Sequence, residues 1–127
     1  MSRSVVLALA AGCLALALAP AGASRQNLIR FHATFTAPTH TPRVGEAWTY
    51  AVFVRDLAGH RIGGVVVPQV IYRRHRIDTV GWLKFRHGVF RRVYRWPAVD
   101  LGRELVFRVT VIAKGGSKRL EYRVRVR

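Results

Sequence analysis

The carboxy-terminal stretch Arg119-Leu120-Glu121-Tyr122-Arg123-Val124-Arg125-Val126-Arg127 alternates apolar and charged side chains without a break. Successive side chains of a β-strand point to opposite faces, so the pattern separates an apolar face from an arginine face. A slip of one residue would bury the arginine row, which fixes the register of the strand. The stretch therefore predicts a half-buried strand at one face of a sheet.

The rest of the chain shows the same two-residue period in short segments separated by Gly, Pro and Asp, and no segment has a helical period of 3.6 residues. Asp56-Leu57-Ala58-Gly59 predicts a turn, and Gly115-Gly116 predicts a hairpin. Besides the carboxy-terminal strand, we expect strands over residues 28–36, 47–55, 62–74, 89–96 and 105–111, with a weak strand over residues 76–83.

Several positions within these strands carry specific expectations. Alternate side chains of the first two strands should point into the core. In the first strand these are Ile29, Phe31, Ala33 and Phe35, and in the second they are Trp48, Tyr50, Val52 and Val54. Pro68 lacks a backbone donor and predicts an edge position or a bulge in the third strand. Arg92 interrupts the apolar face formed by Phe90, Tyr94 and Trp96. The prolines of residues 37–42 predict a kinked connection.

Short strands at spacings of roughly ten residues, without helices, are typical of a two-sheet antiparallel sandwich. The sequence therefore predicts an all-β protein with a single antiparallel β-sandwich of immunoglobulin-like type and about seven strands. A small closed barrel is the alternative architecture.

The amino terminus has the pattern of an export signal. Arg3 precedes an uncharged apolar stretch, Val5 to Ala19, and the small residues Ala21 and Ala23 fit the subsites of signal peptidase. We expect a signal peptide over residues 1–23 and one domain over residues 24–127, located outside the cytoplasm or secreted. An uncleaved anchor and a lipoprotein modified at Cys13, the only cysteine, are the alternatives.

The chain is strongly basic. It has 22 Lys and Arg against 6 Asp and Glu, a formal net charge of +16. Loss of residues 1–23 removes Arg3 and no acidic residue, so residues 24–127 have a formal net charge of +15. Such a charge raises association rates with polyanions. Arginine outnumbers lysine 19 to 3, so GC-rich coding is an alternative origin of the basic bias.

Two groups of basic residues are candidates for anion binding, because guanidinium groups match phosphate and carboxylate oxygens. The first lies on one outward sheet face and consists of Arg108, Arg119, Arg123, Arg125 and Arg127. The second is the run Arg73-Arg74-His75-Arg76. An anionic envelope polymer such as teichoic acid, anionic lipid headgroups and an acidic protein are the candidate partners. Export makes nucleic acid a poor partner.

Part of the chain resembles the immunoglobulin-like domains repeated in bacterial adhesins. Pro42-Arg43-Val44-Gly45-Glu46 precedes alternating Tyr50, Val52 and Val54, the turn at residues 56–59, and Ile62-Gly63-Gly64-Val65. The chain also looks like short exported proteins of GC-rich actinobacteria. The resemblance implies a spacer or binding module outside the cytoplasm, and it implies no catalytic residues.

The reactive side chains are dispersed along the sequence. The acidic residues form no carboxylate pair, the exported serines are only Ser24 and Ser117, and no phosphate-binding glycine loop is present. The histidines lack the spacing of metal ligands, at positions 32, 40, 60, 75 and 87. We therefore expect no enzyme and no cofactor, and a module with a structural or protein-binding role at the cell envelope or outside the cell. Electrostatic binding of an anionic polymer or lipid surface, and metal handling by loop histidines, are the alternatives.

Overall fold

A computed structural model describes residues 29–127 of the chain. The signal peptide expected over residues 1–23, Cys13, Ser24 and the expected strand start at Leu28 lie outside the described residues. The described part contains eight strands and one 3-10 turn: β1 Phe31–Thr36, β2 Ala47–Asp56, β3 Gly64–Tyr72, β4 His75–Thr79, β5 Leu83–Phe85, β6 Val89–Arg95, η2 Ala98–Asp100, β7 Glu104–Ala113 and β8 Gly116–Arg125. The weak strand expected over residues 76–83 is two short strands, β4 and β5, which raises the number from about seven to eight.

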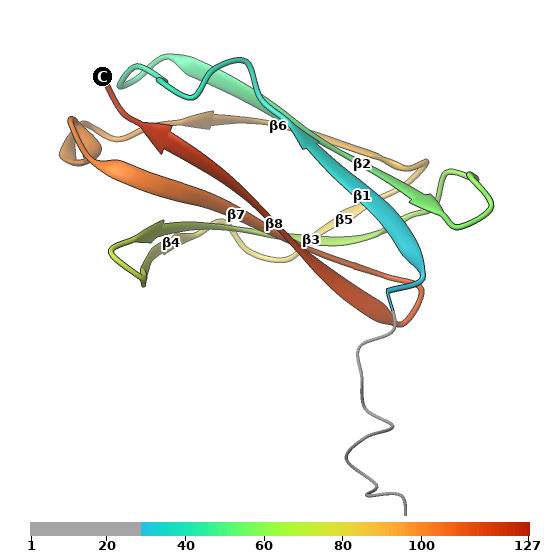
Figure 1. Cartoon of the computed structure of the whole chain (residues 1–127). Coiled ribbons are helices and arrows are strands. Elements are labelled where there is room, and N and C mark those ends of the chain that lie inside the picture. Colours follow the sequence, from blue (N-terminus) through green and yellow to red (C-terminus); the bar gives the residue numbers. More distant parts are fainter. Residues whose placement is uncertain (1–28) are drawn as a thin grey trace, which may run out of the picture.

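The strands form two antiparallel sheets in two layers (Figure 1). One sheet has the order β1-β2-β6, and the other has the order β4-β3-β7-β8 with β5 also paired to β3. The described strands thus confirm an all-β fold with two antiparallel sheets. The sheets do not close on one another, so the alternative of a small closed barrel is wrong.

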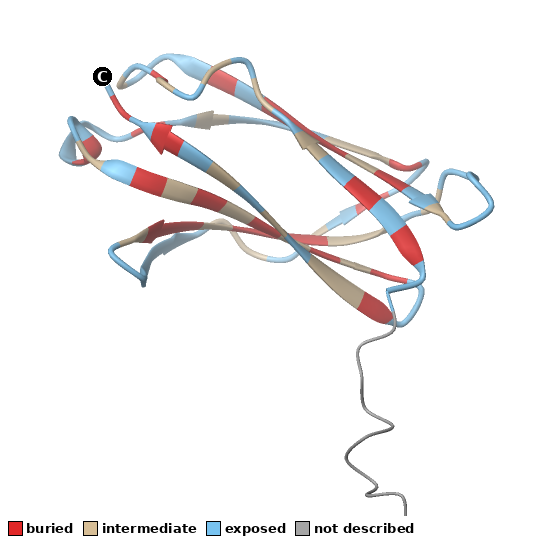
Figure 2. Cartoon of the chain, viewed as in Figure 1, coloured by how far each residue is buried: buried red, intermediate tan, exposed pale blue. Residues whose placement is uncertain are grey.

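The inward faces of the two sheets share one hydrophobic core. The predicted inward residues of β2 are all buried, and β7 contributes an equally buried row: Trp48, Tyr50, Val52, Val54, Leu105, Phe107, Val109 and Val111. The Phe107 ring lies 4.7 Å from the Tyr50 ring and 5.1 Å from the Trp48 ring, across the two layers. Figure 2 shows the resulting alternation of buried and exposed residues along the strands. Each fully buried side chain of this size contributes roughly 1.5–3 kcal/mol to folding.

The sequence predicted an edge position or a bulge at Pro68, but Pro68 lies in the interior strand β3. It pairs with Val109 of β7, and its carbonyl oxygen accepts a hydrogen bond from the Val80 amide at 3.1 Å on the other side. In an antiparallel sheet, the backbone nitrogen and oxygen of one residue point toward the same neighbouring strand. The Pro68 nitrogen, which has no hydrogen to donate, therefore points toward the gap between β4 and β5. The irregularity in pairing lies farther along, between Val70 and Ile71.

Strand ends also differ from the expectation. β1 begins at Phe31, so Ile29 precedes the strand and is exposed, while Phe31 and Ala33 are buried as predicted. β3 starts at Gly64, where an added Cβ would collide with the carbonyl oxygen of Ile112 in β7. Arg92 lies opposite Tyr50 but remains exposed, because β6 is an edge strand from which a long side chain reaches water.

The proline-containing connection between β1 and β2 runs beside the end of β8. The Arg125 amide donates to the His40 carbonyl at 2.8 Å, and the Arg127 amide donates to the Pro42 carbonyl at 2.8 Å. The Val44 amide then donates to the Arg127 carbonyl at 2.8 Å. The connection is therefore kinked, as predicted, and it also covers part of the outer edge of β8, which would otherwise be open to pairing with another chain.

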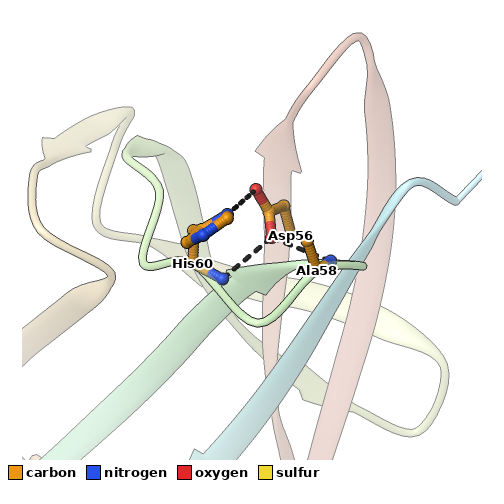
Figure 3. Close-up of polar contacts among 3 residues, drawn as sticks. All are labelled: Asp56, Ala58 and His60. Atoms are coloured by element: carbon orange, nitrogen blue, oxygen red, sulfur yellow. Dashed lines mark hydrogen bonds and ion pairs between the residues drawn. The ribbon is translucent and has the colours of Figure 1, made fainter.

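The turn between β2 and β3 forms as the sequence predicts. Asp56 Oδ1 accepts hydrogen bonds from the amides of Ala58 at 3.0 Å and His60 at 2.8 Å (Figure 3). Gly59 adopts a φ of 89°, which favours glycine. The hydrogen bond from the His60 amide is the main reason that the pKa of the Asp56 carboxyl lies below its ordinary value.

Candidate anion-binding face

The outward face of β7 and β8 carries the predicted arginine row. The pairing register places Arg108 opposite Glu121, Thr110 opposite Arg119, Val106 opposite Arg123 and Glu104 opposite Arg125. These eight side chains share the face that points away from the core, because Leu105, Phe107 and Val124 point inward. Arg119, Arg123 and Arg125 are exposed, and Arg108 is half-buried.

Two glutamates neutralise part of this charge. Arg108 Nη2 lies 3.1 Å from Glu121 Oε1, and Arg125 Nη1 lies 3.4 Å from Glu104 Oε1. Arg119, Arg123 and Arg127 form no ion pair within residues 29–127. The five predicted arginines therefore keep an excess of three positive charges over the two glutamates on and beside this face.

A shallow hollow of about 540 Å³ opens at one end of the face. It has two guanidinium groups, one imidazole, one hydroxyl and one carboxylate in its wall, and its lining residues are His40, Thr41, Glu104, Leu105, Val106, Arg123, Val124 and Arg125. A hollow of this size accommodates a phosphate or carboxylate group together with the adjoining part of a polymer. Arg123 and Arg125 are the predicted site residues that line it.

Arg127 lies close to this hollow but is held by a different contact. Its Nη2 donates to Thr41 Oγ1 at 2.9 Å, which ties the end of the chain to the connection between β1 and β2. Arg108 and Arg119 lie farther along the strands, beyond the residues that line the hollow. The five predicted residues thus form an extended row, of which two line the hollow.

His40 is a site residue that the sequence did not identify. Its ring stacks on Tyr122 with centroids 4.0 Å apart and planes 6° apart, and its Nδ1 donates to the Arg123 carbonyl at 2.6 Å. The sequence predicted a solvated loop residue, and the side chain is indeed exposed. The contact joins residues 83 positions apart, so no local spacing signals it.

The second basic group lies at the tip of the β3–β4 hairpin. Arg73 and Arg74 form a two-residue turn with φ values of 49° and 68°, and His75 and Arg76 begin β4. The Arg73 guanidinium lies 5.1 Å from the centroid of the Tyr72 ring. The sequence expected Arg73 and Arg74 within the third strand, which instead ends at Tyr72.

A polar cluster links the open edges of the two sheets, and the sequence did not predict it. The Tyr94 hydroxyl on β6 donates to Asp78 Oδ2 on β4 at 3.0 Å. Burial, together with the negative charges of Asp78 and Asp100, raises the pKa of Tyr94, so its hydroxyl stays protonated and continues to donate. Burial also raises the pKa of Tyr50 to about 12. The cluster ties the two layers together.

Two further properties bear on the function. Between residues 29 and 127, no three His, Cys, Asp or Glu side chains gather in a group that could hold a metal ion. The alternative of metal handling by loop histidines therefore gains no support from residues 29–127. No helix in the same part of the chain has the length and apolar character needed to cross a membrane.

Comparisons with known proteins identify a likeness of fold. No family model matches the chain, and no curated protein matches its sequence. Among solved structures, an engineered protein matches with a TM-score of 0.53 and 15% identity over 76% of this chain and 20% of that chain. Spo0M, a sporulation control protein from Bacillus subtilis, matches with a TM-score of 0.50 and 15% identity over 76% of this chain and 49% of that chain.

The matched region is therefore a fifth of the first of these structures and about half of the second. At 15% identity the likeness shows a small all-β fold and carries no function across.

Proposed function

We propose that the chain is an exported, non-catalytic, immunoglobulin-like module with a structural or protein-binding role at the cell envelope or outside the cell. The strand order supports the immunoglobulin-like assignment. In that fold the first, second, fourth and fifth strands share one sheet, and the third, sixth and seventh share the other. The chain matches this division except at its fourth strand, which pairs with β3 in the second sheet. Here β1, β2 and β6 form one sheet, and β3, β7 and β8 lie together in the other, with β4 and β5 flanking β3. The adhesin-like stretch, residues 42–65, covers β2 and the start of β3.

Export is supported by the sequence pattern of residues 1–23. Expression in a bacterial host with a signal peptidase should release a chain that begins at Ser24, measured by amino-terminal sequencing of the protein outside the cytoplasm. A chain that stays in the cytoplasm and begins at Met1 would contradict the export part of this proposal. The binding part would remain open to its own test.

A second candidate function is electrostatic binding of an anionic envelope polymer. The observation that carries it is the outward face of β7 and β8, where three arginine charges stay without an acidic partner and Arg123 and Arg125 line an open hollow. Arginine forks suit the phosphate oxygens of such a polymer. The polymer would follow the strand direction along Arg119 and Arg123, which lie on the same face of β8.

Neutralising Arg123, Arg125 and Arg127 together to glutamine separates these two functions. Inorganic polyphosphate is the probe, and its affinity is measured by titration at several salt concentrations. If the face binds phosphates, the variant should bind weakly, and its salt slope should fall by roughly 0.7 for each lost phosphate contact. Unchanged affinity and slope would remove the electrostatic candidate.

Binding of a protein partner should depend less on salt than binding of polyphosphate. The protein should remain partly bound at roughly 1 M NaCl, where the screening length is about 3 Å, because apolar contacts carry the binding. Complete loss of an envelope protein at moderate salt, in the unaltered chain, would count against the protein-binding role.

A further inference from the structure

The turn between β6 and β7 has an inverted pattern of burial. Asp100 is only 2% exposed, whereas Val99 is 66% exposed and Leu101 is 63% exposed. Pro97, Ala98 and Gly102 are exposed as well, so the surface of residues 97–102 is formed entirely by residues without a polar side chain. Charged residues are rarely buried, and contiguous exposed apolar residues mark candidate interaction sites.

The turn is held rigid from beneath. The Asp100 amide donates to the Pro97 carbonyl at 3.0 Å, and the Asp100 carboxylate lies 3.4 Å from Arg103 Nη1. The Gly102 amide donates to the Val126 carbonyl at 2.8 Å, which fixes the turn to the end of β8. Because these contacts occupy the buried side, Val99 and Leu101 are presented to solvent in a fixed position rather than folded onto the core.

Basic residues surround the turn. The Arg103 guanidinium, directly after the turn, lies 4.6 Å from the centroid of the Tyr72 ring, and Arg73 contacts the same ring. Figure 1 shows that the turn of residues 97–102 and the tip of the β3–β4 hairpin lie at the same end of the two layers. This end therefore presents two exposed aliphatic side chains together with the exposed Arg73 and Arg74, while Arg103 pairs with Asp100 beneath the turn.

The hairpin tip is also strained. Both central residues of a two-residue turn of this kind have positive φ, which favours Asn and Gly and disfavours long side chains. Arg73 and Arg74 hold this conformation at 49° and 68°. Residues held in such sparsely populated backbone conformations cluster at binding and switch sites.

We propose that this end of the molecule docks on an anionic lipid surface, with Val99 and Leu101 entering the interface and Arg73 and Arg74 contacting headgroup phosphates. Surface binding of this type combines buried apolar area with attraction to anionic lipids. A convex turn with two aliphatic side chains fits a deformable bilayer. It is too small to supply the roughly 1,200 Å² that a stable protein interface buries.

The chain offers a matched control at its other end. Leu57, in the turn after β2, is 63% exposed, as Leu101 is. Ala47 pairs with Arg95 near one end of β2, and Asp56 ends the strand at the other, so the two leucines lie at opposite ends of the layers (Figure 1). The same substitution at both positions thus distinguishes docking of one end from nonspecific hydrophobic association of the whole chain with the vesicle.

Site-specific fluorescence tests the proposal in the full chain. Cys13 is replaced by serine, and an environment-sensitive NBD group is attached at Val99→Cys or, as the control, at Leu57→Cys. Vesicles contain either phosphatidylcholine alone or phosphatidylcholine with 30% phosphatidylglycerol. The NBD group reports on its own surroundings, so the comparison of positions 99 and 57 identifies which end of the molecule meets the bilayer.

The proposal predicts a blue shift at position 99 on the anionic vesicles, and none at position 57. The NBD fluorescence also gives the partition coefficient of the protein between water and vesicles. Leu101→Ser should lower this coefficient by about tenfold, and Leu57→Ser should leave it unchanged. Arg73→Asn with Arg74→Gly should lower it by roughly fivefold for each arginine, while the variant stays folded. An absent shift at position 99, or equal shifts at both positions, would overturn the proposal. An absent shift would leave the turn as a candidate contact for a protein.

Discussion

The β7–β8 and β3–β4 hairpins have the same kind of turn and are built very differently. Each turn has two central residues with positive φ, 49° and 71° at Lys114 and Gly115, and 49° and 68° at Arg73 and Arg74. β7 and β8 pair over ten consecutive positions, whereas β3 and β4 pair at four positions with a shift in register. The first hairpin thus has glycine at its second turn position and an unbroken ladder.

Their charges differ as well. On the outward face of β7 and β8, Arg108 and Arg125 meet glutamates of the neighbouring strand. Among the described residues, Arg73, Arg74 and Arg76 of the other hairpin meet no carboxylate. The comparison indicates that the β7–β8 hairpin supplies much of the stability, while the β3–β4 hairpin gives up stability and keeps its guanidinium groups available.

Truncation of one apolar residue in each hairpin is expected to give the largest difference. Phe107 on β7 is fully buried, so Phe107→Ala should lower the free energy of unfolding by about 3–5 kcal/mol. Ile77 on β4 is 43% exposed, and Ile77→Ala should cost less than about 1 kcal/mol. Urea unfolding measures both values, and similar losses would break the comparison.

Relief of the turn strain should give the next largest effect. Arg73→Asn with Arg74→Gly is expected to raise the free energy of unfolding by about 1–2 kcal/mol, since both residues then suit positive φ. Lys114→Asn in the other turn is the control and should gain less, because Gly115 already occupies the second position. Equal or absent gains in urea unfolding would show that the β3–β4 turn is not strained.

Removal of Glu104 and Glu121 should change the free energy of unfolding less than the turn variants do, and should change the affinity for polyphosphate more. Glu104→Gln and Glu121→Gln each break one exposed ion pair, which is worth less than about 1 kcal/mol. Both changes free an arginine on the outward face, so affinity for polyphosphate should rise if that face is the binding element. Titration with polyphosphate checks this, and a fall in affinity would argue that the glutamates position the arginines.

The turn after β2 provides the smallest effect, and it depends on pH. The pKa of the Asp56 carboxyl is lowered in the folded state, chiefly by the His60 amide hydrogen bond. Its contribution to stability is therefore present above the ordinary carboxyl pKa and is lost as the pH falls through the lowered value. The stability of the chain and of Asp56→Asn should converge at low pH. A constant difference between them across the acidic range would contradict this.

The same two hairpins show how far the sequence predicts the fold. The alternation is regular along β7 and along β8 from Arg119, so faces, register and outward arginines follow from the two-residue period. The β3–β4 turn was misplaced because the third strand was expected to run to Arg74, whereas β3 ends at Tyr72. Pro68 predicted an edge position or a bulge, and its missing donor instead faces the gap between two short strands. Nothing local marks Arg73-Arg74 as a turn, since arginine rarely takes positive φ.

The candidate site was predictable only where it lies on one pair of strands. Arg108 and the β8 arginines follow from periodicity, but His40 reaches them through a contact between distant parts of the chain. The link from Tyr94 to Asp78 joins the edges of two different sheets, and no spacing encodes which edges meet. The buried Asp100 among exposed aliphatics contradicts the usual burial pattern, so sequence reasoning expects the reverse.

Two triple variants of equal charge test most directly the proposal that the arginines bind anions through their position on the outward face and not through their number. One neutralises Arg123, Arg125 and Arg127 beside the hollow, and the other neutralises the exposed Arg55, Arg91 and Arg92 of the opposite sheet. Polyphosphate affinity at fixed salt should fall steeply in the first and little in the second. Equal losses in both would show that the basic composition alone attracts the polymer, and would contradict a built binding face.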